Sequence, residues 1–385
     1  MVNGFLLLIF WEWQPSWPAC TSSIADRNFA ISMEVVVDYI IVGQGLAGTV
    51  LAWELLNRGK KVRVYDVPAN NQSSLISAGI CNPVTGRAMT ETYLANKLFP
   101  FLHQWYAAAE QQSGKRFFYP MPLYRPFLSR EEQQRWKVRQ ANQPGAFIER
   151  LTDCAAEPGA LNDHFGGLWI NRSGYLNVRT WIDVARHRLE ESDSYAAENF
   201  DQLELRVDAG VHYKMIRASR IVFCEGLAAL DSKWFGWAPI RPLKGEILSV
   251  RTNLKPDKII SRGAYLVPGD GENSFVVGST YEHAPFVSGI TESGRTQILD
   301  KLSKLYSGPI EVIHQGWGIR PTVVDRRPLL GGHPEAQNVV IFNGMGTKGV
   351  SLTPYFASQL ANWMEEGAAL PNEVNISRFK SLYSK

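Results

Sequence analysis

Two hydrophobic patterns alternate along this chain of 385 residues. Short, nearly continuous apolar runs at 37–42, 220–224 and 338–342 are typical of buried strands in a parallel sheet. The stretches 240–252 and 264–279 instead alternate apolar and polar residues, as half-buried antiparallel strands do. The sequence therefore predicts an α/β fold in which a parallel sheet is interrupted by antiparallel strands.

Helical spacing of apolar residues predicts helices between these strands. The predicted helical stretches are 46–58, 89–112, 131–140, 174–189 after a short turn, 296–306 and 350–364. Two further stretches carry no such periodicity, and we expect a loop at 73–87 and irregular structure at 143–167.

The most informative local pattern runs from Val37 to Asp66. Gly43, Gly45 and Gly48 stand in G-x-G-x-x-G register between a strand and a helix, and Asp66 ends the next strand. Such glycines allow a tight turn, close approach of a pyrophosphate and packing of helix on strand, while the acid accepts a ribose hydroxyl. The motif alone is weak, but its complete context predicts a dinucleotide site. These residues leave NAD and FAD both open.

A second glycine-rich segment, NGMGTKG at 343–349, lies between the last predicted strand and the last predicted helix. The amino end of a helix carries partial positive charge and free backbone N–H groups. The segment therefore predicts a second place where the chain can face an anion.

Composition narrows the class of protein. Charged residues make up 20% and hydrophobic residues 45% of the chain, and both fractions are ordinary for a globular protein. The net charge of +3 is too small to argue for nucleic acid as a partner. The four cysteines are far apart, so neither a zinc site nor a disulfide framework is predicted. The length favours two or three domains.

Residues 1–32 differ from the rest of the chain. Their apolar run is too short to span a bilayer, and no basic residue precedes Arg27, as the start of a signal peptide would require. We expect the working protein to begin near Met33, with residues 1–32 as an extension outside the fold. A cytoplasmic location without a membrane span follows as an expectation.

Several motifs in order resemble one known family. After the opening unit come SSLISAGICNPVTGR, RIVFCEG, PLKGEIL, AYLVPGDGENSFVVGSTYE, GIRPTVVDRRPLLGG and NGMGTKGVSLTPYFASQLANW. Together they resemble the D-amino-acid oxidase and glycine oxidase family of FAD-dependent oxidoreductases. The resemblance covers most of 37–364 and is weakest at 91–168.

The resemblance implies a Rossmann-like FAD-binding domain on a parallel sheet and a substrate domain on an antiparallel sheet with helices. The implied bounds are 33–86, 166–240 and 316–370 for the FAD domain, 87–165 and 241–315 for the substrate domain, and 371–385 for a C-terminal tail.

The resemblance also implies where FAD would lie, held without a covalent link because no Cys or His stands in a position that suggests one. Asp66 would bind the adenosine ribose, where relatives usually have Glu. The remaining implied cofactor contacts are Gly43, Gly45, Leu46, Ala47 and Gly48 at the pyrophosphate, Ser77, Ala78, Gly79 and Ile80 along the flavin, Gly226 after a strand, and Gly346, Thr347, Lys348, Gly349 and Val350 at the pyrimidine end. No metal site is predicted.

Three residues are candidates for substrate binding. Arg320 matches the family's carboxylate-binding arginine, and a guanidinium suits a two-point contact with a carboxylate; the alternative is a structural ion pair with Asp325. Tyr265 matches a tyrosine that assists this carboxylate, or it packs in the sheet. Lys348 falls where some relatives place a cation beside the substrate.

The implied function is oxidation of an amine or amino acid by hydride transfer to the flavin, with O2 or another electron acceptor. We expect a small substrate that bears a carboxylate. Two alternatives remain: an FAD domain that acts on a modified tRNA base, and a flavin-binding protein without turnover. The sequence leaves open whether the enzyme is an oxidase or a dehydrogenase.

Overall fold

The computed structural model describes residues 34–69, 72–86, 88–143 and 145–383. The expected extension at 1–32 lies outside these residues. The residues from Glu34 onward make up one compact unit by their mutual contacts.

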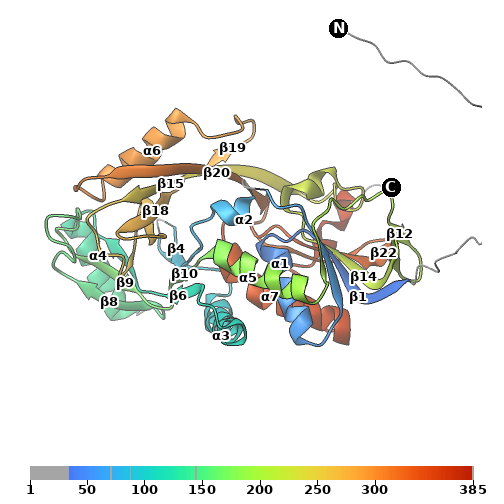
Figure 1. The fold of residues 1–385 in the computed structure, drawn as a ribbon. Helices are drawn as coiled ribbons and strands as arrows, with labels where there is room; N and C mark the ends of the chain where they lie inside the picture. The colour runs from blue at the N-terminus through green and yellow to red at the C-terminus, as the bar shows by residue number, and fades with distance from the viewer. Residues whose placement is uncertain (1–33, 70–71, 87, 144, 384–385) are drawn as a thin grey trace, which may run out of the picture. The chain divides into compact units, whose positions relative to one another are not determined.

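The first large sheet has a parallel centre (Figure 1). Its parallel strands are β11 (Tyr195–Ala196), β2 (Val62–Tyr65), β1 (Val35–Val42), β14 (Ile216–Phe223) and β22 (Ala336–Asn343). Antiparallel strands β13 (Val211–Tyr213), β12 (Arg206–Val207) and β21 (Leu329–His333) complete it. The predicted parallel sheet is thus confirmed, with antiparallel additions.

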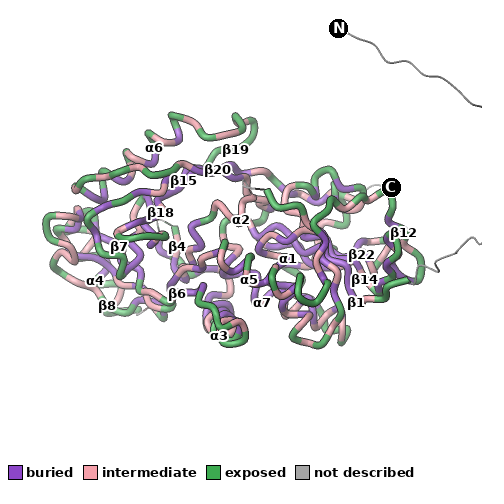
Figure 2. Tube along the Cα trace, viewed as in Figure 1, coloured by how far each residue is buried: buried purple, intermediate pink, exposed green. Residues whose placement is uncertain are grey.

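Both faces of this sheet are buried, which explains the continuous apolar runs. Along β1, Tyr39 and Ile41 belong to one hydrophobic cluster, whereas Ile40 and Val42 belong to another. The first cluster contains side chains from α1 (Leu46–Asn57), α3 (Ala95–Ser113), α5 (Val178–Glu191) and α7 (Gly349–Glu366). Figure 2 shows buried residues along these strands, and the burial is complete toward the carboxyl ends of β1, β14 and β22.

The second large sheet is almost entirely antiparallel. Its main path is β19 (Glu282–His283), β15 (Ile240–Arg251), β18 (Ser274–Gly278), β17 (Ala264–Pro268), β16 (Ile259–Arg262), β7 (Leu123–Pro126), β9 (Gly167–Ile170) and β8 (Ile148–Thr152), with β20 (Glu311–Val323) paired to β15. Only β16 and β7 pair in parallel. Helix α6 (Glu292–Ser303) packs on this sheet through Ile298 and Leu302, and α4 (Arg130–Asn142) precedes β8.

Several shorter elements complete the structure. Strands β3 (Ile80–Cys81), β10 (Gly174–Leu176) and β6 (Phe118–Pro120) form one small sheet, and β4 (Val84–Thr85) pairs with β5 (Thr90–Glu91). The remaining short elements are α2 (Ser73–Ile76), η1 (Gly226–Asp231) and η2 (Ile376–Leu382).

Four local predictions were wrong. The stretch 143–167 contains β8, an edge strand that buries only Ile148 fully and so shows no clear alternation. The predicted loop at 73–87 holds α2, β3 and β4, and the predicted helix at 89–112 begins with β5. The helix predicted at 296–306 is α6, which starts earlier because Thr291 caps its amino end through a bond from Gly294 N–H.

The domain bounds stay a prediction. The two large sheets correspond to the two kinds of sequence pattern, but the expected C-terminal tail also contributes to the fold. Asn375 forms a β-bridge with Leu330, and Ile376 is buried against the first sheet.

Gly48 makes the tightest approach in the opening unit. A Cβ atom at this position would lie 1.9 Å from the carbonyl oxygen of Gly43. We predict that Gly48→Ala lowers the free energy of unfolding by about 1–3 kcal/mol or more, because backbone rather than a flexible side chain must move. Urea unfolding measures this change.

Gly59→Ala is the control for that measurement. Gly59 has a φ of +74°, and a Cβ atom placed on it would meet no other atom within 4 Å, so only backbone strain of roughly 1 kcal/mol is expected. Equal losses in the two variants would contradict the role of the Gly43–Gly48 contact.

Candidate functional site

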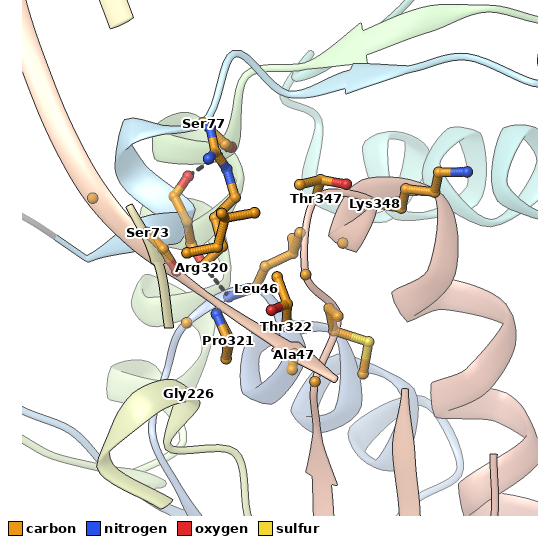
Figure 3. A pocket seen from close by; sticks show the side chains of 18 of the residues that line it. Leu46, Ala47, Ser73, Ser77, Gly226, Arg320, Pro321, Thr322, Thr347 and Lys348 are labelled. Atoms are coloured by element: carbon orange, nitrogen blue, oxygen red, sulfur yellow. Dashed lines mark hydrogen bonds between the residues drawn. The ribbon is translucent and has the colours of Figure 1, made fainter. Parts of the chain in front are cut away.

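One cavity of about 1740 Å³ brings most of the predicted site residues together (Figure 3). It lies at the carboxyl ends of β1, β2, β14 and β22 and extends along β15, β17 and β20. Gly48 does not line it. The predicted residues that do are Gly43, Gly45, Leu46, Ala47, Asp66, Ser77, Ala78, Gly79, Ile80, Gly226, Tyr265, Arg320, Gly346, Thr347, Lys348, Gly349 and Val350.

The turn after β1 is held against its neighbours by backbone contacts. Gly43 has a φ of +95°, and its N–H donates to the carbonyl of Tyr65 at 2.8 Å. A Cβ on Gly43 would lie 2.7 Å from the carbonyl oxygen of Cys224, so only glycine fits here. The turn therefore exposes main chain to the cavity at the amino end of α1.

Asp66 uses one carboxylate oxygen and leaves the other open. Its Oδ1 accepts from the backbone N–H of Gln44 at 2.9 Å. Its Oδ2 is buried and has no hydrogen-bond partner among the described residues. A buried acceptor of this kind requires a donor, and a ribose hydroxyl would supply one.

The loop after α2 lies beside this turn. Ser77 donates through its hydroxyl to the carbonyl of Ser74 at 2.8 Å. A Cβ on Gly79 would lie 1.9 Å from the carbonyl oxygen of Leu176, and Ile80 pairs with Tyr175 across β3 and β10. Strand β10 thus fixes the loop along one wall of the cavity.

The second glycine segment follows β22 and begins α7. Asn343 donates from Nδ2 to the carbonyl of Gly226 at 2.8 Å, and Gly346 N–H donates to the carbonyl of Pro321 at 3.1 Å. No side chain caps the amino end of α7, so its first N–H groups are available to a ligand. This end of the helix faces the cavity, as its lining residues Gly349 and Val350 show.

Arg320 extends from β20 into the cavity without an acidic partner among the described residues. Its Nη2 donates to Ser279 Oγ at 3.1 Å, and its Cζ lies 5.1 Å from the centre of the Tyr281 ring. The alternative pairing with Asp325 is not formed, because that carboxylate pairs with Arg378 at 2.8 Å. The guanidinium is therefore oriented by neutral groups, which leaves its charge for a ligand.

Tyr265 and Gly245 complete this region. Burial raises the pKa of Tyr265 to about 12, although the positive charge of Arg320 opposes the shift, so its hydroxyl stays protonated as a donor. A Cβ at Gly245 would lie 2.1 Å from Arg320 Nη1. The absence of a side chain at Gly245 thus makes the room that the guanidinium occupies.

Lys348 lies apart from this group. Figure 3 shows its side chain extending away from Arg320. Its Nζ contacts the hydroxyl oxygens of Thr92 at 3.3 Å and Thr85 at 3.4 Å. Burial lowers the pKa of Lys348, and the nearby positive charges of Arg327 and Arg326 lower it further.

Sequence reasoning missed three residues of the site. Ser74 accepts from Leu46 N–H at 3.0 Å, and Ser279 positions Arg320. Glu225, two residues after the end of β14, lines the cavity with a buried Oε2 that has no partner in the described chain, and burial raises its pKa to about 7. Only Glu225 had a local signal, since an acid just past the end of a buried strand falls at the ligand edge of the sheet.

Comparison with known proteins defines the class of protein. The family model of the FAD dependent oxidoreductases matches residues 38–363, and the chain belongs to this family. The predicted family and its cofactor, FAD, are thereby confirmed.

Several named proteins are similar to this chain. It is 26% identical over 372 residues to the bifunctional protein ThiO/ThiG of Trichormus variabilis, covering 89% of this chain and 55% of that protein. The chain thus spans about half the length of the first curated relatives that it matches. Its fold matches glycine oxidase from Geobacillus kaustophilus with a TM-score of 0.73, at 20% identity and covering 88% of this chain and 97% of the other.

Iminodiacetate oxidase from a Chelativorans species has the same fold. The TM-score is 0.69 at 21% identity, and the match covers 87% of this chain and 97% of the other.

The residues present fit FAD. The cavity exceeds the roughly 300–1,000 Å³ of an ordinary small-molecule site, as a dinucleotide and a substrate together require. The open Asp66 Oδ2 suits a ribose hydroxyl, and the turn at Gly43 suits a pyrophosphate.

Among residues 34–383, apart from the gaps given above, no group of His, Cys, Asp and Glu could hold a metal ion. None of the helices in this part of the chain is long and apolar enough to cross a membrane.

Glu225 makes the stability of the FAD-free protein depend on pH. The unfolded chain releases the Glu225 proton near its ordinary pKa of 4.5, whereas the folded chain holds it to about 7. Above pH 4.5 unfolding therefore releases a proton, and the free energy of unfolding falls as the pH rises to about 7. A glutamine at this position stays neutral at every pH. We therefore predict that, between pH 4.5 and pH 8, the free energy of unfolding of Glu225→Gln falls by up to about 3 kcal/mol less than that of the wild type.

Urea unfolding between pH 4.5 and 8 measures this effect. Glu91→Gln is the matched control, because Glu91 also lines the cavity but is exposed. A pH slope that is the same in wild type and Glu225→Gln would contradict the prediction.

Proposed function

We propose that this protein is an FAD-dependent oxidase or dehydrogenase of a small amine or amino acid that bears a carboxylate, with FAD held non-covalently. The observation that carries the proposal is Arg320, whose guanidinium faces the cofactor cavity, is oriented by Ser279 and has no acidic partner among the described residues. The names of two structural neighbours, glycine oxidase and iminodiacetate oxidase, are consistent with this chemistry.

FAD, when bound, would supply the redox chemistry: the carbon beside the substrate nitrogen would be oxidised by loss of a hydride to give an imine, and O2 or another acceptor would take the two electrons onward. The protein has to place that carbon and the cofactor in register. Arg320 would hold the substrate carboxylate in a charge-assisted contact, with the Tyr265 hydroxyl as a second donor. The amino end of α7 would stabilise negative charge that develops on the cofactor.

An anaerobic screen tests the proposal. We predict that purified protein is yellow and that its flavin absorbance bleaches on mixing with a small amino acid or N-methyl amino acid. Reduction only by a modified uridine in tRNA would favour the tRNA alternative. Bound flavin that no amine reduces would favour a protein without turnover.

Arg320→Met should then raise the KM for a carboxylate substrate by about 10²–10³-fold, because the loss of a buried charged contact costs about 3–4 kcal/mol. The matched measurement uses the corresponding amine without a carboxylate, such as dimethylamine beside sarcosine. Steady-state or anaerobic stopped-flow kinetics measure both. An unchanged KM for the carboxylate substrate would reject the role of Arg320.

Gly245→Ala tests the room around the guanidinium. The new methyl group would displace the flexible end of Arg320 rather than backbone, so the fold should persist while carboxylate binding weakens by about 10–100-fold. Gly316→Ala in the neighbouring strand is the control, because its Cβ would make an ordinary 3.4 Å contact with Ile76. Equal kinetics in Gly245→Ala and wild type would contradict this positioning role.

A further inference from the structure

A second group of cations lines the same cavity beyond α7. Lys348, Arg326 and Arg327 all belong to the lining, together with the hairpin of β4 and β5. The cavity therefore continues past the amino end of α7, away from Arg320. We call Lys348, Arg326 and Arg327 the distal cations.

The distal cations have no acidic partner in the described part of the chain. The contacts of Lys348 Nζ are the hydroxyls of Thr85 and Thr92, and the guanidinium of Arg327 lies 3.8 Å from the centre of the Tyr93 ring. The acid that lines this end, Glu91, is exposed and accepts from Asn96 Nδ2 at 3.4 Å.

This arrangement is unfavourable without an anion. The partly buried guanidinium of Arg327 and the half-buried ammonium of Lys348 repel each other, whereas Arg326 is exposed and contributes a weaker, solvent-screened repulsion. Two hydroxyl oxygens only partly replace the water that the ammonium has lost. The lowered pKa of Lys348 reflects both effects. An anionic ligand group at this point would offset the repulsion and complete the hydrogen bonds of the ammonium.

The ammonium of Lys348 is separate from the guanidinium of Arg320. The Lys348 side chain extends away from Arg320 in Figure 3, with Thr347 between them. The pyrophosphate of FAD is expected at the turn after β1, at the amino end of α1, and so leaves the distal cations unneutralised. Two separate positive positions in one cavity match a ligand with two negative ends.

We propose that the substrate carries two anionic groups, one held by Arg320 and the other by Lys348 with Arg327. The substrate class is an amine or amino acid with a second carboxylate, of which an N-carboxymethyl amino acid is the simplest form. This inference rests on the proposed function for the oxidation itself, but the binding of two anionic groups can be measured without turnover.

The first arm of the test measures binding to the FAD-loaded protein. Succinate and butyrate have the same chain length and differ in one carboxylate, and each is titrated while the visible spectrum of the flavin is recorded. We expect succinate to bind at least about tenfold more tightly than butyrate, since one charged contact contributes about 1.5–3 kcal/mol. Equal affinities would overturn the proposal, even if no amine were ever oxidised.

The second arm measures anaerobic flavin reduction by matched amines. The measured quantity is the rate constant for flavin reduction divided by the dissociation constant of the amine. This ratio should be higher for iminodiacetate than for sarcosine, and higher for D- or L-aspartate than for alanine of the same configuration. Reduction by amines without a preference for the second carboxylate would overturn the inference but leave the proposed function intact.

Substitutions test which residues cause the preference for a second carboxylate. Lys348→Met and Arg327→Met should each remove most of the preference for the second carboxylate, whereas Arg320→Met should weaken both members of each pair. Lys255→Met is the charge-matched control, because Lys255 is exposed and does not line the cavity. Flavin content and thermal melting check that each variant is folded and loaded.

One rival role for Lys348 makes a different prediction. If Lys348 served only the flavin, Lys348→Met would slow reduction by sarcosine and iminodiacetate by the same factor and would leave the succinate-to-butyrate ratio unchanged. That result, together with an unchanged ratio in Arg327→Met, would overturn the proposal.

Discussion

The site depends on the backbone contact between the turns that follow β1 and β14. Gly43 packs against the carbonyl of Cys224, and Cys224 N–H donates to the carbonyl of Val42 at 2.7 Å. The next turn is joined through Asn343, which bonds to the carbonyl of Gly226. These contacts bring the ends of three parallel strands to one edge, where the amino ends of α1 and α7 face the same cavity.

The same constraint explains how much of the site was predictable. A glycine turn between a strand and a helix is specified locally, so the positions of Gly43, Gly45 and the segment before α7 could be predicted from spacing. The surroundings of Arg320 could not, because Ser279 and Gly245 reach it only through the pairing of β15 with β20 and β18. The direction of a long side chain such as Lys348 is likewise set by a distant hairpin.

Most of the fold followed from periodicity because both large sheets have well-buried centres. The incorrect predictions concern short elements with few buried residues. β8 is an edge strand with one fully buried residue, and α2 is a single turn with none. Ser74 illustrates the limit most clearly, since its hydroxyl caps Leu46 across 28 positions of sequence and nothing in the local pattern indicates it.

Strands β15 and β20 link the cofactor edge to the second sheet. At one end of the pair, Ile240 and Val323 belong to the hydrophobic cluster on the first sheet; toward the other end, Leu248 and Val250 belong to the cluster of the second sheet. Arg320 lies between these two anchored regions, so its main chain is held in place, and the bond to Ser279 orients its guanidinium. A cation fixed in this way can set the distance between a bound carboxylate and the cofactor, and a second anion position beyond α7 would then also set the length of the substrate.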